Sequence, residues 1–295
     1  MKFRAHDTFF IRKGWLAKGV KHIQKNPAVF LGREGANPMD VLGIGANMVK
    51  SLRYWLQAVG ITGENTRREQ VFTDLGEIIR KHDPYFEELG TLWLLHYRLA
   101  SNRDHATAWW WFFNEFRLNE FSRDDFVASF DRWLRMQEEM KDRDVPERSL
   151  ADDFDCIIHT YLSRTQSKPN RVDPESNIDC PFGELGLVGI AERREKTYRK
   201  LAPVKGSLPP LILLAVLSDQ AKDKEELRIA DIQSAPCNAG KVFNLDVITL
   251  TAALYQLELL KHLKVNRTAG LDVIRFAPKR TFETCVEMYY GGLSK

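Results

Sequence analysis

Apolar side chains recur at helical spacing through the first part of the chain. Residues 8–25 carry them every three or four positions, which predicts one helix that ends before Pro27. A short helix is expected over residues 39–42, and the glycines within residues 43–45 then break the chain. From Ala46 to Val59 the apolar stripe is strong, so this segment is predicted to be an amphipathic helix.

The pattern changes twice before the middle of the chain. Residues 61–72 are polar and predict a short hairpin, after which a helix is expected to begin near Thr73. Residues 91–116 are the most aromatic part and predict two helices that break around residues 101–104. A further helix is expected over about residues 123–140, with a charged and solvated end.

Three consecutive tryptophans lie in this aromatic part, at positions 109–111. Neighbouring side chains on a helix point about 100° apart, so these three rings cannot all enter one local core. At least one is therefore expected to contact another domain or to line a cleft.

The second half repeats part of the same pattern. Residues 163–182 contain three prolines and few apolar side chains, which is typical of a connection between domains. Helices are then predicted over residues 209–218, 229–234 and 245–260. Residues 263–276 alternate around a central Ala-Gly pair, which predicts a two-stranded hairpin.

Both ends of the chain therefore share one order: helix, short helix, glycine-containing turn, longer amphipathic helix and hairpin. This order is that of a winged helix-turn-helix. We predict a mainly α fold, with winged helix-turn-helix modules at both ends and an aromatic-rich helical middle. The expected division is an N-terminal domain over residues 1–162, a connection over 163–182 and a C-terminal winged-helix-like domain over 183–295.

Charge distinguishes the N-terminal end from the rest. Of the 295 residues, the first 60 hold ten Lys and Arg against three acidic residues, a net charge of +7, although the whole chain carries only +3. Such an end favours a polyanion as partner, whereas a solvated basic surface without a ligand is the alternative. Four widely spaced cysteines, no apolar span and no secretory leader lead us to expect a cytoplasmic protein without a membrane segment.

The predicted helix from Ala46 to Val59 carries the candidate DNA contacts. With its apolar stripe inward, the outward positions are expected to be Asn47, Lys50, Ser51, Tyr54 and Gln57, with Arg53 at the boundary and Arg67 and Arg68 on the following hairpin. Asn pairs with adenine, and Lys and Arg suit guanine or phosphate. The alternative is that this helix contacts a protein.

The corresponding C-terminal helix has few basic residues and is expected to expose Asp246 and Glu258, although its hairpin carries Lys264 and Arg267. We expect this helix to pack on a partner or on the first domain rather than on DNA. Whether it touches DNA or protein stays open at this stage.

Signals of catalysis are sparse. No phosphate-binding loop, dinucleotide fingerprint or zinc-protease motif is present. The candidate catalytic group is His6 and Asp7 with Arg12 and Lys18, which would combine acid–base groups with phosphate clamps. The alternative is that His6 and Asp7 only cap a helix. His96 stands in an apolar run, which is typical of a core histidine whose hydrogen bonds are satisfied.

Several segments resemble a bacterial family of unknown function whose genes lie in DNA phosphorothioation clusters, that of the SspB-like nicking components. The resemblance spans nearly the whole chain and is carried by these segments: HDTFFIRKGWLAKG, VLGIGANMVKSLRYWL, TLWLLHYRLASN, ATAWWWFFNEF, NIDCPFGELGLV and TAGLD. It implies a role in DNA modification and phage defence beside a sulfur-transfer enzyme that resembles phosphoadenosine-phosphosulfate reductase. It defines no nuclease motif that could be carried over residue by residue.

Together these observations predict a protein that binds duplex DNA and acts within a phosphorothioation system. We expect this protein to be a DNA nicking endonuclease assisted by Mg²⁺ or Mn²⁺, because phosphodiester cleavage commonly uses a metal held by carboxylates. The alternative is a non-catalytic adaptor that positions the sulfur-transfer enzyme on DNA. The family resemblance favours the nickase, whereas the lack of a recognisable carboxylate motif favours the adaptor.

Overall fold

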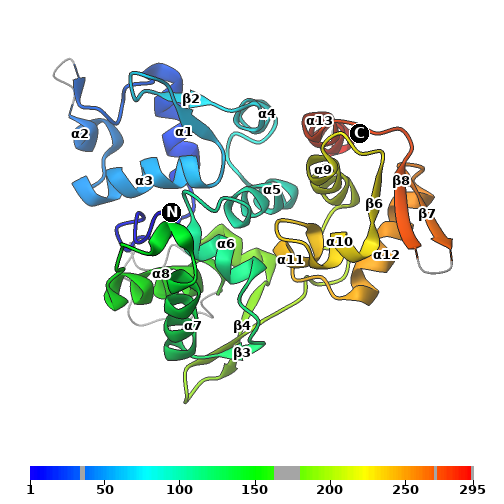
Figure 1. The fold of residues 1–295 in the computed structure, drawn as a ribbon. Coiled ribbons are helices and arrows are strands. Elements are labelled where there is room, and N and C mark those ends of the chain that lie inside the picture. Colours follow the sequence, from blue (N-terminus) through cyan, green and yellow to red (C-terminus); the bar gives the residue numbers. More distant parts are fainter. Residues whose placement is uncertain (34–36, 163–179, 269–270, 294–295) are drawn as a thin grey trace.

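The chain folds into two lobes that meet along a helical seam. The computed structural model describes residues 1–33, 37–162, 180–268 and 271–293. Figure 1 shows one lobe in blue to green, built mostly from the first half, and a second in yellow to red. No single helix among these residues is long and apolar enough to cross a membrane, although one bent pair passes that test by length and composition.

The first half begins with the basic segment and ends with the aromatic helices. Its elements are α1 (Trp15–Lys25), α2 (Pro38–Leu42), α3 (Ala46–Ala58), β1 (Thr62–Glu64), β2 (Gln70–Phe72), α4 (Asp74–His82), α5 (Leu89–Ala100), α6 (Thr107–Asn114), β3 (Glu120–Phe121), α7 (Arg123–Arg135), the 3-10 turn η2 (Glu138–Met140) and α8 (Glu147–Tyr161).

The described part of the second half contains five strands, β4 to β8, and five α-helices, α9 to α13. Its elements are η3 (Pro181–Leu185), β4 (Val188–Glu192), β5 (Thr197–Lys200), α9 (Pro210–Ala221), β6 (Glu226–Arg228), α10 (Ile229–Ser234), α11 (Ala239–Val242), α12 (Val247–Leu259), β7 (Leu263–Thr268), β8 (Leu271–Phe276) and α13 (Phe282–Leu293).

Where local pattern was strong, the predicted elements are confirmed. The mainly helical class, helix α3 and both hairpins agree with the sequence analysis. The predicted helix over residues 8–25 was too long, because Asp7, Thr8 and Gly14 adopt a positive φ and α1 starts only at Trp15. Helices α8 and α13 were not predicted.

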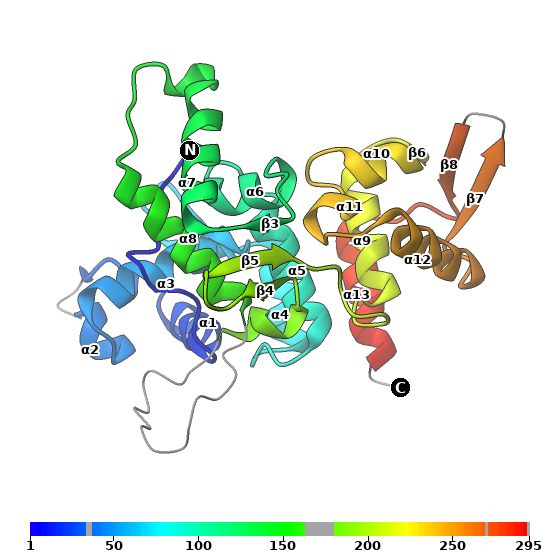
Figure 2. The same cartoon turned by 90° about the horizontal axis from the view of Figure 1, so that it is seen from below.

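The expected connection over residues 163–182 lies mostly outside the described residues. Strands β4 and β5, which follow it, form an antiparallel sheet of order β3-β5-β4, in which Phe121 of β3 pairs with Tyr198 of β5. Residues 188–200 therefore join a strand of the first half, as Figure 2 shows beside α8. The last sheet has the order β6-β8-β7 and stays within the second lobe.

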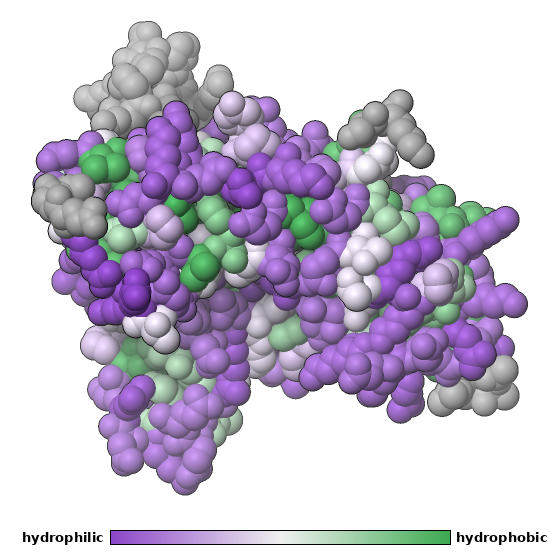
Figure 3. Space-filling view, turned by 90° about the horizontal axis from the view of Figure 1, so that it is seen from above, coloured by the Kyte–Doolittle hydropathy of each residue, from purple (hydrophilic) through white to green (hydrophobic). Residues whose placement is uncertain are grey.

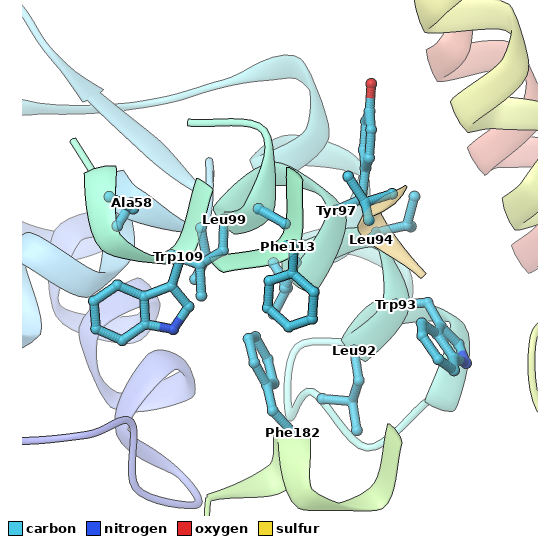
Figure 4. Close-up of a cluster of buried hydrophobic side chains, with 14 of the residues drawn as sticks. Ala58, Leu92, Trp93, Leu94, Tyr97, Leu99, Trp109, Phe113 and Phe182 are labelled. Carbon is cyan, nitrogen blue, oxygen red and sulfur yellow. The ribbon is translucent and has the colours of Figure 1, made fainter. Parts of the chain in front are cut away.

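Helix α5 is buried on almost every side. Its sequence, LGTLWLLHYRLA, is apolar around the whole helix, as expected for an element inside a core rather than on a surface. Figure 4 shows Leu92 and Leu99 of α5 in one cluster with Trp109 and Phe113 of α6 and Phe182 of η3. All five side chains are at most 2% exposed.

The three consecutive tryptophans of α6 face three different neighbours. Trp109 packs edge-on against Trp55 of α3, and Trp111 stacks on Phe130 of α7. Trp110 is half-buried, and its Nε1 lies 3.2 Å from Sγ of Cys237 in the second lobe. The expectation that one of these rings would contact another part of the molecule is confirmed.

Tyrosines hold α13 against the first lobe. Tyr289 OH accepts the backbone N–H of Gly90 at 3.1 Å, and Tyr290 OH lies 2.6 Å from Oγ1 of Thr91. A Cβ atom at residue 90 would stand only 2.2 Å from the ring of Tyr289, so this close approach requires glycine. Tyr97 of α5 likewise donates to Asp219 of α9.

His96 joins three elements inside this seam. The ring is fully buried, its Nε2 donates to the carbonyl of Val242 in α11 at 2.6 Å, and its Nδ1 accepts from Tyr161 OH at 2.7 Å. Because a carbonyl can only accept, the ring is the neutral Nε2–H tautomer. Burial lowers the pKa of His96 to about 4, against the smaller opposing effect of the Val242 bond. The expectation of a satisfied core histidine is confirmed.

We predict that His96 makes the fold sensitive to mild acid. Above pH 6.5 the ring is neutral in both states, so its contribution to stability is fully present. As pH falls from 6.5 towards 4, only the unfolded chain takes up the proton, and about 3 kcal/mol of unfolding free energy should be lost. Urea denaturation over this pH range measures the slope.

The variant His96→Gln should remove most of this pH dependence. The variant His22→Gln changes a half-buried ring on α1 whose pKa is lowered less than that of His96, so it should keep most of the pH dependence. An unchanged slope in His96→Gln would place the titrating group elsewhere.

Candidate nucleic-acid interface

Helix α3 and the β1–β2 hairpin each present exposed polar residues at the basic N-terminal end, although most of α3 is buried. Asn37 caps α2 by accepting the N–H of Met39, and Gly43 ends α2 with a φ of 62°. Glycine adopts this left-handed backbone conformation without strain because it has no Cβ atom. The conformation redirects the chain from α2 into α3. The hairpin then returns antiparallel, with Thr62 opposite Phe72.

Several of the predicted DNA contacts are exposed on these elements. Asn47 and Lys50 lie on the open side of α3, and Arg67 and Arg68 lie at the tip of the hairpin. Arg33 binds this tip from the loop after α1, because its Nη2 donates to the carbonyl of Arg67 at 2.9 Å. The arrangement places positive charge on a helix and on the hairpin that follows it.

Helix α1 extends the positive field. Lys18, Lys21 and Lys25 recur at helical spacing, and each contributes to lowering the pKa of His22, after the larger effect of burial. These three lysines surround the ring of His22 with positive charge.

Arg53 forms an ion pair with Glu64 of the hairpin. Its Nε and Nη2 donate to Oε1 of Glu64 at 3.0 and 2.7 Å, and Gln57 donates to the same oxygen at 2.6 Å. Burial raises the pKa of Glu64, but these bonds outweigh that effect and hold it below its ordinary value. Glu64 therefore stays ionised and neutralises Arg53, a pairing that helix periodicity within α3 could not reveal.

The expectation that Ser51 and Tyr54 face outward was wrong. Ser51 is fully buried and Tyr54 is 9% exposed. The cause is the N-terminal segment, which lies over this side of α3: the carbonyl of Phe9 accepts Trp55 Nε1 at 2.8 Å, and the ring of His6 packs near Tyr54. Tyr54 is therefore not on the surface that could meet DNA in this conformation.

Three of the four candidate catalytic residues, His6, Arg12 and Lys18, have side-chain partners within the fold. His6 is fully buried; its Nδ1 accepts the N–H of Thr8 at 3.0 Å, so its Nε2 donates to Oδ1 of Asp153 at 2.8 Å. Burial raises the pKa of Asp153, and the bond from His6 opposes that rise. Neither the imidazole nor Asp153 is open to a polymer.

The two cations of that group are also engaged, and Asp7 is only partly exposed. The guanidinium of Arg12 lies 5.3 Å from the ring centroid of Trp15, and Lys18 Nζ donates to the carbonyl of Leu42 at 3.1 Å. Sequence analysis missed Asp153, because it lies 147 residues from His6 and no local pattern links the two.

We tested whether the described residues fit a divalent metal. Within the described ranges, no group of three or more His, Cys, Asp or Glu side chains could hold one. The pair His6–Asp153 brings one carboxylate and a nitrogen that already carries its proton. No step of a metal-assisted reaction is therefore assigned to named residues of this site.

Comparison with known proteins places this geometry in context. A family model described as "Protein of unknown function (DUF4007)" matches residues 3–290. Two solved structures, "Magnesium ion-bound SspB crystal structure" and "SspB crystal structure", match with TM-scores of 0.85 and 0.83 at 26% identity. Both alignments cover 100% of this chain and 89% of the other. No curated protein matches.

We predict that His6 stabilises the fold. Replacing His6 by Ala removes the side-chain partner of the buried Asp153 carboxyl and leaves it only the backbone N–H of Arg4, which should lower the free energy of unfolding by about 3 kcal/mol. Thermal and urea unfolding measure the loss.

The matched control is Asp7→Asn. Asn accepts the positive φ of this position, and the side chain is only half-buried, so the change should stay within about 0.5 kcal/mol. Native-like unfolding of His6→Ala would contradict the structural role and return His6 to the catalytic candidates.

Proposed function

Because the chain belongs to the DUF4007 family and shares its fold with SspB, we propose that it is the DNA-binding component of a bacterial DNA phosphorothioation system. The exposed cations of α3 and the β1–β2 hairpin carry the DNA-binding part of this proposal. The resemblance to SspB-like proteins supports the phosphorothioation part.

In this proposal the N-terminal module is a winged helix-turn-helix. The order α1, α2, α3 and hairpin suits that motif, with α3 as the recognition helix and the tip at Arg67 and Arg68 as the wing. Thirteen helical residues measure about 20 Å, enough to lie along part of a major groove. Asn47 and Lys50 then face the groove, and the wing follows the phosphate backbone.

Two roles are compatible with such a module. An adaptor that positions a sulfur-transfer enzyme on DNA is favoured by the structural use of His6, Arg12 and Lys18, which leaves those candidates committed to the fold. A nickase is favoured by the likeness to an SspB structure described as bound to magnesium. We propose the adaptor role first and keep the nickase as the second candidate.

The first prediction of this proposal concerns Lys50. Lys50→Ala should weaken binding to all duplex sequences alike and reduce the dependence of log affinity on log salt by about one. Arg53→Ala should have the smaller effect, because Glu64 already neutralises that charge. Gel-shift titrations at several salt concentrations measure both.

The control is Lys141→Ala, an exposed lysine directly after the 3-10 turn η2, where it pairs with Glu138. It should change neither affinity nor salt dependence. Equal affinities of Lys50→Ala and the native chain, with duplex DNA bound by both, would exclude α3 as the recognition helix.

The second prediction separates the two roles. An adaptor should leave supercoiled plasmid intact when incubated with Mg²⁺ or Mn²⁺ at a concentration that saturates DNA binding. Relaxation to the open-circle form, abolished by a chelator and dependent on Lys50, would establish the nickase instead. Agarose gels of plasmid incubated with native and variant protein give the answer directly.

A further inference from the structure

Helix α12 exposes large apolar side chains that no described element covers. Ile248 is 82% exposed, Leu259 83% and Val247 63%, and Tyr255 and Leu260 are also open. The helix buries only one narrow stripe against its own lobe. On the face that Figure 3 draws, the surface is mainly hydrophilic and hydrophobic residues form only small separate areas.

This surface is unlike that of α3, which stands at the same place in the element order. Between Val247 and Leu259 the only charged side chain is Glu258, and its carboxylate accepts the N–H of Val265 at 2.9 Å. Contiguous exposed apolar residues mark an interaction site. Helix α12 itself carries no Lys or Arg, the residues that contact the phosphates of duplex DNA.

The exposed residues follow helical spacing. Ile248, Ala252, Tyr255 and Leu259 recur at intervals of four, three and four positions, which places them on one stripe of α12. The guanidinium of Arg267 lies 5.6 Å from the ring centroid of Tyr255, at the side of this stripe. A stripe of this kind packs well against a second helix.

The stripe is also self-complementary about its midpoint, between Ala253 and Leu254. In an antiparallel pair of α12 helices centred there, Ile248 meets Leu259, and small Ala252 meets large Tyr255. The same register brings Val247 opposite Leu260. A two-fold axis requires this pattern, because each residue then contacts its counterpart twice.

The charges at the helix ends fit the same register. Asp246 stands immediately before α12 as its N-cap, and Lys261 follows the helix. In the antiparallel pair, each Asp246 lies at the end where the other copy has Lys261. The helix dipoles also oppose each other, so the two ends attract rather than repel.

From the apolar stripe, its symmetric register and its end charges, we propose that α12 is a homodimer interface. Two copies of the chain pair through antiparallel α12 helices, with Ile248, Ala252, Tyr255 and Leu259 at the centre. Asp246 and Lys261 form the polar ends. The proposal is independent of DNA binding, because α3 lies in the other lobe (Figure 1).

Sedimentation velocity of the full-length chain over a wide concentration range tests this proposal. The native chain should dimerise, and Ile248→Asp should weaken dimerisation by about tenfold or more. An acid in the first turn favours the helix, so the variant should fold normally. Met136→Asp, which changes a residue that is 71% exposed on the other lobe, is the matched control and should dimerise like the native chain.

A charge cycle tests the register. Lys261→Glu should weaken the dimer, and it should do so less when Asp246 is replaced by Asn, which keeps the N-cap. A native chain that stays monomeric, or a dimer that ignores Ile248→Asp, would overturn the proposal. Binding of a monomeric chain to phosphatidylcholine vesicles would also overturn it, by assigning α12 to a membrane surface.

Discussion

The fold depends on the burial of α5 on almost every side. A helix with so little contact with solvent must be covered by other elements, and each buried polar group on it must find a partner inside the protein. His96 meets this constraint through α8 and α11, Thr91 through α13, and Tyr97 through α9. Because these partners come from both halves of the chain, covering α5 also joins the two lobes.

This constraint explains which features could be predicted from the sequence. Helix α3 and the hairpins follow from local periodicity and glycine positions, so they are visible in a short window. The pairing of β3 with β5 cannot be recognised in a short window of sequence, because Phe121 and Tyr198 are separated by the whole of α7 and α8. Covering elements such as α13 are specified by the surface they cover, which only the folded chain defines.

The candidate site shows the same limit. Periodicity placed Lys50 outward correctly, because no described element buries this side chain. It failed for Tyr54, one helical turn further along the same side, because the N-terminal segment covers α3 there and is itself held by the buried pair His6–Asp153. It also gave no sign that Glu64 neutralises Arg53, since the hairpin brings that acid back to the helix.

Two modules with a similar order of elements thus present opposite surfaces, basic on α3 and apolar on α12. Order of elements fixes the shape of such a module, whereas the side chains on its exposed helix decide what it binds.

If α12 pairs two copies, each dimer carries two α3 helices related by a two-fold axis. Duplex DNA has an approximate two-fold symmetry of its own backbone, so both copies can contact one duplex in the same way. A weak phosphate contact at each α3 would then be strengthened through effective concentration rather than through further charge. In that case the proposed DNA binding would not require a further free cation at Arg53, which Glu64 neutralises.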